Sequence, residues 1–593
     1  PYVFSVPMKS ISRFGLADGH RVVFSVDKRH RPDARAVSCF ITEVLGHVND
    51  PGVDVLTLVR QAGIPVEFPE NALEETKNIP NEVSKVETEN RLDLRDEFIF
   101  TIDGDDTKDI DDAISFAKTE NGFSLGVHIA DVTHYVKENS ALDAAALNRG
   151  TSIYLADRVI PMLPHKLSSG ICSLFPDVDR LSLSCMMNVN KNGDVVDYKI
   201  SESVIRSKKR FTYTEVQNIL DTCNAVSDKD SDSGENSDER FAAGEVDSDS
   251  GERFAASEVD SDSGERLAKS EVDSNIDKSF DVLISNMDEL REILNKKRQK
   301  RGALDFDLPE AKIRVDKNGR VISIEPYPRN NATGIIEEFM ILCNETIAAH
   351  FFSRQTPFVY RSHEAPSTAK VKSLQILAVT MKIPTANNLQ KLLESAKNTP
   401  AAYAISTAVL QAMPQANYTH TNPTHFGLAS QAYCHFTSPI RRYADLQIHR
   451  VIRATLGEFS SEQKKHFEAI FPEVCAQCSR TERAAEALER DVAELKKTQF
   501  MADKIDKKFK AIVSGVASWG VYVMLENTAE GLVPAPVLLR QRYKFYKEEA
   551  VYKTKRRPGE ESKILRHGSE VVVRLVSVNE DERRMNFVLL EQK

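Results

Sequence analysis

The stretch with the clearest chemical potential is a dense run of carboxylates between two apolar segments. It reads Thr101-Ile-Asp-Gly-Asp-Asp-Thr-Lys-Asp-Ile-Asp-Asp-Ala-Ile114 and carries aspartates at positions 103, 105, 106, 109, 111 and 112. Carboxylates packed this closely repel one another unless cations neutralise them. Hard oxygen ligands in this number suit Mg²⁺ or Mn²⁺, with waters and a substrate phosphate completing the coordination shell. The run therefore indicates metal-assisted phosphoryl transfer.

Two other interpretations of the acidic run compete with such a site. A solvated acidic turn is the plain alternative for any cluster of charges. A calcium loop of the EF-hand type fails on spacing, because a loop starting at Asp103 puts Thr107 at a ligand position and Lys108 where glycine is required. The apolar flanks, Phe98-Ile-Phe and Ala113-Ile-Ser-Phe, indicate that the acids project from a buried scaffold. This favours phosphoryl transfer over the solvated turn.

A second stretch, His435-Phe-Thr-Ser-Pro-Ile-Arg-Arg-Tyr-Ala-Asp-Leu446, combines a helix start with two arginines. Ser438 followed by Pro439 predicts a hydroxyl N-cap and a proline in the first turn. Arg441 and Arg442 would then lie in that turn, where the helix dipole disfavours cations. They fit there if a phosphate binds the free backbone N–H groups and the guanidinium groups together. A surface helix with incidental charges is the alternative.

Aromatic residues also stand near basic ones at several places. Tyr154, Trp519 and Tyr522 have lysine or arginine within a short distance in the chain, and Phe306 follows the basic run 296–301. Base stacking combined with neutralisation of the backbone is the physics of single-stranded nucleic-acid binding. Core packing is the simpler explanation for any one of these rings, so only the interleaving as a whole favours nucleic-acid binding.

The segments that must position these groups fall into an α+β, multidomain pattern. Residues 1–75 alternate in the β manner, and residues 507–593 return to that pattern with glycine-containing turns. The second of these predicts a small barrel of the OB type. Between them, residues 76–91 are polar and non-periodic, as in a linker, and residues 92–505 form a large mixed domain whose last part is strongly helical.

An acidic repeat interrupts the large domain. Glu245-Val-Asp-Ser-Asp-Ser-Gly-Glu-Arg-Phe254 recurs, with leucine as its last residue, at Glu258–Leu267, a period of 13 residues. Residues 228–273 hold 16 acidic and 5 basic side chains, a net of −11, so the rest of the −10 chain stands at +1. With little apolar content, residues 225–275 are predicted to form a disordered surface insertion. The near-neutral remainder is compatible with basic patches that bind nucleic acid.

Composition excludes several classes of protein. The 593 residues are 41% hydrophobic and 28% charged, which is typical of globular domains. No apolar run approaches the ~18 residues of a membrane-spanning helix, so a membrane partner is not expected. Eight cysteines spread over this length form no disulfide framework and indicate a reducing, cytoplasmic location. Because the chain starts at Pro1 inside a β-patterned segment, a fragment or processed product is expected.

Four long motifs resemble those of the ribonuclease II/R (RNB) exoribonucleases, and the overall likeness is to the bacterial ribonuclease R branch. They are Ile102-Asp-Gly-Asp-Asp-Thr-Lys-Asp-Ile-Asp-Asp112, Arg149-Gly-Thr-Ser-Ile-Tyr154, Val159-Ile-Pro-Met-Leu-Pro164 and Phe436-Thr-Ser-Pro-Ile-Arg-Arg-Tyr443. In that family cold-shock OB domains precede an RNB catalytic domain and an S1 domain follows it. The resemblance implies a partial cold-shock domain at 1–75, a linker at 76–91, an RNB domain at 92–505 and an S1 domain at 507–593.

The resemblance also implies roles for the charged residues. Asp103, Asp109 and Asp112 would hold Mg²⁺, or Mn²⁺ in its place. Asp111 would be the carboxylate most critical for the chemical step. Arg441 would stabilise charge on the scissile phosphate.

Further residues are implied to bind RNA. Tyr154 and Phe306 would clamp the terminal bases, and Arg442, Trp519 and Tyr522 are additional candidates. The implied activity is processive 3′→5′ hydrolysis of single-stranded RNA with a free 3′ end to 5′-mononucleotides, by a monomer acting in RNA turnover. The alternative hypotheses are a catalytically silent single-stranded RNA-binding protein and a metal-dependent endonuclease that uses the same acids.

Overall fold

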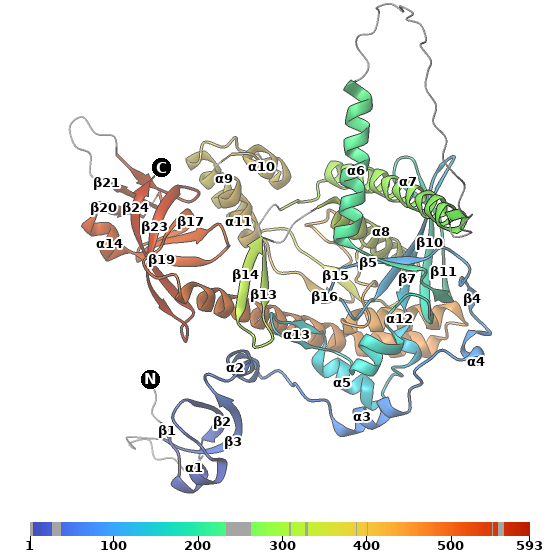
Figure 1. Cartoon of the computed structure of the whole chain (residues 1–593), viewed down its shortest axis with the longest axis horizontal. Helices are drawn as coiled ribbons and strands as arrows, with labels where there is room; N and C mark the ends of the chain where they lie inside the picture. The colour runs from blue at the N-terminus through green and yellow to red at the C-terminus, as the bar shows by residue number, and fades with distance from the viewer. Residues whose placement is uncertain are drawn as a thin grey trace, which may run out of the picture.

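Three structural units are arranged along one long helix in the computed structural model (Figure 1). The structure describes residues 4–26, 37–232, 263–306, 310–326, 330–386, 388–399, 401–547, 549–554 and 562–592. Helix α13 (Ser461–Ala502) packs against the N-terminal unit, the central domain and the C-terminal barrel. Its N-terminus is capped by Ser460, whose hydroxyl accepts a hydrogen bond from the N–H of Gln463. The helix predicted in the last part of the large domain is confirmed.

A seven-stranded sheet forms the centre of the molecule, with the strand order β12-β5-β6-β7-β10-β11-β4. Inner strands such as β7 are apolar along most of their length because other elements cover both faces, among them helix α8 on β7. Strand β5 pairs antiparallel with β6 and parallel with β12. The strands are β4 (Leu92–Asp93), β5 (Phe100–Asp103), β6 (Asp112–Thr119), β7 (Gly122–Ala130), β10 (Asp179–Asn190), β11 (Val195–Arg206) and β12 (Lys209–Thr212).

Helices and short hairpins surround this sheet and complete the central domain. Two of the hairpins, β8–β9 and β13–β14, lie against α13. The remaining elements of the domain are α5 (Ala141–Arg149), β8 (Ile153–Tyr154), β9 (Val159–Ile160), β13 (Ala311–Val315), β14 (Val321–Pro326), α8 (Asn331–Ser353), β15 (Tyr360–Ser362), α9 (Thr368–Thr380), α10 (Leu389–Ala396), α11 (Ala402–Ala412), β16 (Asn417–Thr419) and α12 (Tyr443–Leu456), with short helical turns at Val132–His134 and Leu167–Ile171.

The N-terminal unit is a three-stranded sheet, in the order β1-β3-β2, with two helices. Its elements are β1 (Phe4–Ser5), α1 (Met8–Phe14), β2 (His20–Val26), β3 (Val37–His47) and α2 (Val53–Gln61).

The predicted linker is partly wrong, because helix α3 (Glu70–Lys77) ends inside it and helix α4 (Lys85–Thr88) lies within it. Ala72 is fully buried in the core of the central domain, and Glu75 accepts a hydrogen bond from the N–H of Leu142. One buried alanine face anchors α3, which polar composition alone could not reveal.

A closed barrel ends the chain, with the strand order β17-β18-β19-β24-β23. It confirms the small barrel predicted from alternation and glycine-containing turns. The barrel strands are β17 (Lys508–Ala517), β18 (Gly520–Leu525), β19 (Glu530–Pro534), β23 (Glu570–Asn579) and β24 (Arg584–Gln592), and a small sheet and a helix lie beside them: α14 (Ala535–Arg540), β20 (Tyr543–Tyr546), β21 (Val551–Thr554) and β22 (Ile564–Leu565).

The acidic repeat lies between two helices, α6 (Tyr213–Asp232) and α7 (Ser263–Arg301), and Figure 1 shows α6 pointing away from the central sheet. Residues 233–262, which hold most of the repeat, lie outside the described residues. The prediction of disorder over 225–275 is wrong at its two ends, which are helical. Both helices are anchored in the core, through Leu220 and Met287 for example, and extending an existing helix costs little.

Among the described residues, no helix combines the length and apolarity needed to cross a membrane. None of the eight cysteines, all of which lie among the described residues, forms a disulfide bond, in agreement with the predicted lack of a disulfide framework.

Candidate active site

The acidic run forms the connection between β5 and β6 at one end of the central sheet. Arg210, on the neighbouring strand β12, donates hydrogen bonds through Nη2 to the carbonyl oxygens of Gly104 and Thr107, both at 2.9 Å. On the opposite side, the Ser173 hydroxyl accepts from the N–H of Ile110 at 3.0 Å and donates to the carbonyl oxygen of Lys108 at 2.9 Å. The loop is therefore held at both sides by its backbone, which leaves its carboxylates available for other partners.

Asp111 is the most deeply buried acid of the run, with 4% of its surface exposed. Its Oδ1 accepts a hydrogen bond from the N–H of Ile440 at 2.8 Å, while Oδ2 is buried without a hydrogen-bond partner among the described residues. The Nε of Arg441 lies 3.7 Å from that oxygen. Burial raises the pKa of Asp111 well above its usual range, and Arg441 offsets this only in part. One oxygen is thus fixed and the other lacks a partner.

Asp103 and Asp112 share this lack of compensation. Burial, followed by the charge of Asp112, raises the pKa of Asp103 to about 7. Burial raises the pKa of Asp112 to about 6 against the opposing charges of Arg441 and Arg442. Buried carboxylates with raised pKa values are characteristic of sites built for a cation or for proton transfer.

A divalent cation fits this set of donors. Asp103 Oδ2, like Asp111 Oδ2, is buried without a hydrogen-bond partner in the described chain, and both atoms are hard oxygen ligands. No group of three or more His, Cys, Asp or Glu side chains in the described ranges is close enough to form a ready-made metal cage. The fit to a divalent cation therefore rests on the two buried carboxylate oxygens without a hydrogen-bond partner.

Two sequence motifs meet to place Arg441. Its carbonyl oxygen accepts hydrogen bonds from the N–H of Ser152 at 2.9 Å and from the Thr151 hydroxyl at 3.0 Å. Gly150 precedes them with a φ of 67°, and a Cβ there would lie 1.9 Å from the Thr481 hydroxyl, so glycine is required. The side chain of Arg441 remains 41% exposed. The backbone of Arg441 is therefore fixed, while its guanidinium is open to a substrate.

The predicted helix start at Ser438 is wrong, because α12 begins at Tyr443. The cause is Asp445, whose Oδ1 accepts the N–H of Ser438 at 2.8 Å and draws the preceding segment into a turn. Asp445 is fully buried and also forms a bidentate ion pair with Arg442, at 2.7 and 2.9 Å. Arg442 lines the same cavity as Arg441, but it neutralises Asp445. The expectation that the two arginines share a phosphate stays a prediction.

Tyr154 approaches the acids from the β8–β9 hairpin. Its hydroxyl donates a hydrogen bond to Asp109 Oδ2 at 2.5 Å, and its backbone N–H donates to Glu489 of α13 at 2.8 Å. Tyr154 is 41% exposed while its hydroxyl is held, and an exposed aromatic ring is suited to stacking on a base.

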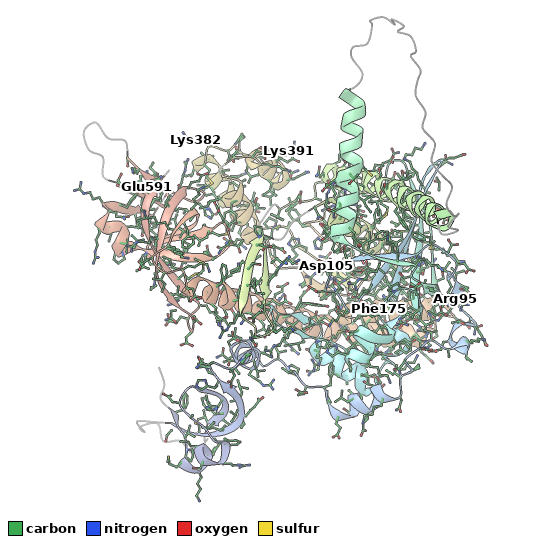
Figure 2. The ribbon with its side chains drawn as sticks, in the orientation of Figure 1. Arg95, Asp105, Phe175, Lys382, Lys391 and Glu591 are labelled. Carbon is green, nitrogen blue, oxygen red and sulfur yellow. The ribbon has the colours of Figure 1, made fainter. Side chains whose placement is uncertain are left out.

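All five predicted catalytic residues line one cavity of about 1260 Å³. Asp105 and Phe175, both labelled in Figure 2, line it as well. The members that the sequence predicted are Asp103, Asp109, Asp111, Asp112, Tyr154, Arg441 and Arg442.

Three predicted RNA-binding residues are not among the described lining of this cavity. Phe306 is partly buried against the apolar cluster of α9, α10 and α11. Trp519, 61% exposed, donates a hydrogen bond from its indole N–H to the Tyr522 hydroxyl at 3.0 Å on the C-terminal barrel. Their roles remain predictions.

Several residues that build the site were missed at the sequence level. Arg210 and Ser173 hold the acidic loop, Glu489 holds Tyr154, and Asp445 sets the turn before α12. Arg210 ends a short basic run, 208–210, which would have been its single signal. The other contacts join segments far apart in the chain, so no local pattern marks them.

Comparison with known proteins identifies the family of the chain. A family model described as the RNB domain matches residues 91–458, and one described as a cold shock domain matches residues 3–69. The chain is 37% identical to ribonuclease R of Thermotoga maritima, over 100% of this chain and 78% of that protein. It is 36% identical to ribonuclease R 1 of Lactococcus lactis, over 97% of this chain and 66% of that protein.

A solved structure shows the same arrangement. RNase R of Mycoplasma genitalium, in complex with ribose-methylated single-stranded RNA, matches with a TM-score of 0.83 at 26% identity, covering 99% of this chain and 85% of that chain. The match extends over the N-terminal unit, the central domain and the C-terminal barrel. The chain therefore belongs to the RNB family of exoribonucleases, in its ribonuclease R branch.

Proposed function

We propose that this chain degrades single-stranded RNA processively from a free 3′ end and releases 5′-mononucleotides. The single observation that supports this most strongly is the convergence of four carboxylates and one exposed arginine in one cavity. The negative carboxylates suit a divalent cation and the positive guanidinium suits the adjacent phosphodiester. The activity also follows from membership of the RNB family.

Asp103, Asp109 and Asp112 are proposed to hold Mg²⁺, with Mn²⁺ as the substitute. Bound there, the cations would supply an activated water for in-line attack and neutralise charge on the leaving 3′-oxygen. The raised pKa values of Asp103 and Asp112 support this assignment, because a nearby cation would return both carboxylates to the ionised form.

The side chains of the protein itself position the phosphate. Arg441 is proposed to pair with the non-bridging oxygens of the scissile phosphate, since its guanidinium is exposed and its backbone is locked. Asp111, with Oδ1 fixed by Ile440, directs Oδ2 toward the same region and is proposed as the carboxylate most critical for the chemical step. Tyr154 is proposed to stack on a base near the 3′ end while its hydroxyl orients Asp109.

The remaining assignments concern domains and context. Residues 1–75 are proposed to be a partial cold-shock domain, and residues 507–593 an S1 domain in which Trp519 and Tyr522 contact RNA. Phe306 is proposed to complete the base clamp. We further propose a monomer that acts in RNA turnover in the cytoplasm, a location that eight cysteines without a disulfide bond in the described chain support.

The test is to incubate the protein with 5′-labelled single-stranded RNA, with Mg²⁺ or with EDTA, and to resolve the products over time. Progressive 3′ shortening to a short end-product, abolished by EDTA, is expected. Internal fragments would favour an endonuclease. RNA that binds in a gel shift but stays intact would favour a catalytically silent RNA-binding protein.

A further inference from the structure

A buried lysine joins three parts of the molecule. Lys496 lies on α13 with 2% of its surface exposed. Its Nζ donates to Asp54 Oδ2 at 2.6 Å, to the carbonyl oxygen of Gly319 at 3.0 Å and to Gln499 Oε1 at 3.1 Å. An ammonium group has three protons, so each proton has an acceptor. A buried charge satisfied in this way locks its partners together, since removing any one of them leaves a buried polar group unpaired.

The three partners come from different elements. Asp54 belongs to α2 of the N-terminal unit, Gln499 to α13, and Gly319 to the turn of the β13–β14 hairpin. Figure 1 shows α13 between α2 and this hairpin, and both elements contact α13. Gln499 strengthens the junction by donating to Asp54 Oδ2 at 2.8 Å.

The β13–β14 hairpin needs such an anchor. It is a separate two-stranded sheet, and an isolated hairpin of this kind is marginally stable in water. Its turn is ordered locally by Asp316, whose Oδ1 accepts the N–H groups of Asn318 and Arg320 at 2.8 and 2.9 Å. Lys496 then holds the turn through the Gly319 carbonyl oxygen.

The same hairpin reaches the catalytic cavity. Lys312, on β13, lines the cavity that holds Asp111 and Arg441. A lysine ammonium at this place is a point charge suited to an RNA phosphate beyond the one at the carboxylates. The position of Lys312 depends on the hairpin, and the hairpin depends on its contacts with α13 and on its anchored turn.

We infer that Lys496 is a positioning residue for RNA in this enzyme: it fixes the β13–β14 hairpin so that Lys312 holds the substrate backbone during successive cleavages. The inference rests on the proposed exoribonuclease function. Lys496 acts through Lys312 and touches no substrate. Its loss shortens the run of cleavages per binding event and leaves the chemical step itself intact.

The experiment measures run length. Protein is bound to 5′-labelled RNA, Mg²⁺ is added together with excess unlabelled RNA as a trap, and the nucleotides removed per binding event are counted. For Lys496→Met we expect run length to fall about fivefold, the scale for losing one charge-assisted contact, with an unchanged rate per cleavage step. The double variant Asp54→Asn with Lys496→Met leaves no unpaired buried charge, so it tests the same prediction without the folding penalty.

Two controls separate positioning from general loosening. Arg60→Leu removes the ion pair between Arg60 of α2 and Glu43 within the N-terminal unit, and should leave run length unchanged. Lys312→Gln should reproduce the defect of Lys496→Met, and combining the two should add nothing further, because both act through one contact. Additive defects, or an unchanged run length in Lys496→Met, would overturn the inference.

A second measurement does not depend on nuclease activity. Hydrogen exchange of residues 311–326 should rise in Lys496→Met and stay unchanged in Arg60→Leu. If the wild-type protein failed to shorten RNA, the proposed function would fail while this measurement still tested the anchor. If exchange in the hairpin did not change, the anchor itself would be wrong.

Discussion

Two buried aspartates lie beside each other in the central sheet and have opposite surroundings. Asp111 directly precedes β6 and Asp131 directly follows β7, and the N–H of Ala130 donates to the carbonyl oxygen of Asp111 at 2.9 Å. Asp131 is 1% exposed and accepts from Arg91 at 2.6 Å, from Arg453 at 3.0 and 3.2 Å, and from the Thr133 hydroxyl at 2.7 Å. Asp111 has one hydrogen bond and a distant arginine.

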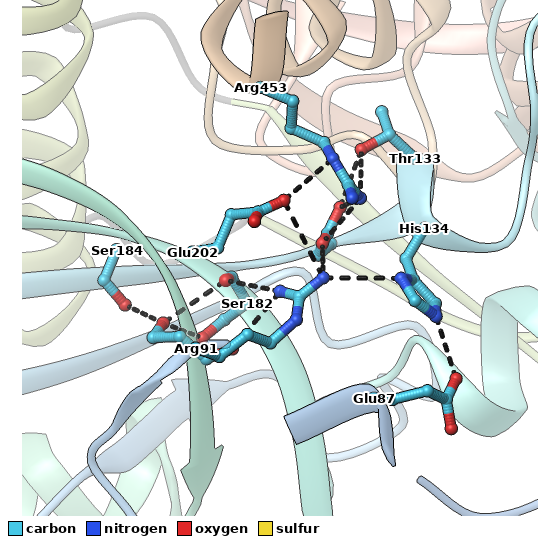
Figure 3. A network of polar contacts seen from close by, with 10 residues as sticks. Glu87, Arg91, Thr133, His134, Ser182, Ser184, Glu202 and Arg453 are labelled. Carbon is cyan, nitrogen blue, oxygen red and sulfur yellow. Dashed lines mark hydrogen bonds and ion pairs between the residues drawn. The ribbon is translucent and has the colours of Figure 1, made fainter. Parts of the chain in front are cut away.

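The pKa values of the two aspartates follow this difference. Burial would raise the pKa of Asp131, but Arg453 and Arg91 outweigh it and hold that pKa below its usual range. Figure 3 shows how far the network extends, through His134 to Glu87 and through Arg453 to Glu202. At Asp111 burial prevails and the pKa rises. The protein's own arginines compensate the charge of Asp131, whereas the charge of Asp111 is left for a cation and a substrate. Asp131 therefore belongs to a structural ion network and Asp111 to the candidate active site.

The largest effect is expected at Asp111. Asp111→Asn should lower the rate of RNA cleavage by about 10⁴-fold, the scale for a buried aspartate that supports reacting groups. RNA binding should persist, and thermal stability should not fall because a poorly compensated charge is removed. Single-turnover cleavage and a gel shift measure the two. Asp105→Asn, an exposed acid of the same loop, is the matched control with near-normal cleavage. Cleavage at the wild-type rate in Asp111→Asn would refute the assignment.

The reverse pattern is expected at Asp131. The side chain of Arg91 is only 4% exposed. Asp131→Asn therefore leaves a buried guanidinium without its carboxylate partner. The free energy of unfolding should fall by about 3–5 kcal/mol, the usual cost of breaking a buried pair. Urea unfolding measures it, and cleavage by the remaining folded protein should be normal. A loss of cleavage without a loss of stability would contradict the structural role assigned to Asp131.

Two arginines extend the comparison. Arg441→Ala should lower the cleavage rate by about 10²–10³-fold, the scale for one preorganised donor at a developing charge. Stability should be unaffected because the guanidinium is exposed. Arg453→Met, by contrast, should destabilise the protein and leave cleavage by the folded fraction unchanged, since Arg453 pairs with Asp131 and Glu202. Equal effects of the two substitutions on cleavage would contradict the separate roles.

The dependence on pH should also have opposite signs in the two regions. Asp103 and Asp112 have pKa values raised to about 7 and 6, so without metal the folded state binds more protons than the unfolded chain between about pH 4 and 7. Their contribution to stability is therefore lost as the pH rises through this window. The contribution of Asp131, whose pKa is lowered, is present above about pH 4 and lost as the pH falls further.

Mg²⁺ distinguishes these contributions. Because a cation binds the ionised carboxylates, the rise in melting temperature on adding Mg²⁺ should be larger at pH 8 than at pH 5. Calorimetry with Mg²⁺ and with EDTA measures it. Asp103→Asn should reduce the Mg²⁺ response, whereas Asp131→Asn should keep it. If the rise in melting temperature did not depend on pH, the assignment of these carboxylates as metal ligands would be wrong.

The smallest effect is expected at Tyr154. Tyr154→Phe keeps the ring for stacking and removes the hydroxyl that donates to Asp109. One hydrogen bond to a charged group corresponds to about 1.5–3 kcal/mol, and partial exposure reduces it, so a cleavage rate lowered about tenfold is the upper bound. Tyr154→Ala should weaken RNA binding as well. If both variants bound RNA equally, stacking by this ring would be wrong.

Much of the site could be predicted from the sequence because its acids are contiguous. Six aspartates between two apolar segments identify a charged loop on a buried scaffold, and the central sheet confirms it. The C-terminal barrel could also be predicted, from the alternation of apolar and polar residues. The helical end of α3 inside residues 76–91 could not be, because that helix is anchored by Ala72, which lies outside the segment.

The start of α12 shows the same limit. Ser438 and Pro439 are good starting residues, but the buried carboxylate of Asp445 takes both the Ser438 N–H and the Arg442 guanidinium. A local propensity of a few tenths to one kcal/mol yields to a fully buried, charge-assisted contact.

By itself the sequence determined which groups are present: the carboxylates, the arginines and the strands that carry them. The tertiary structure alone decided which buried charge is compensated. Asp131 is paired by Arg453, 322 residues away, while Asp111 meets the N–H of Ile440, 329 residues away, and keeps an oxygen without a partner in the described chain. Compensation depends on distances of a few ångström between groups remote in the chain, because Coulomb and hydrogen-bond energies fall off over that length, and no local pattern encodes them.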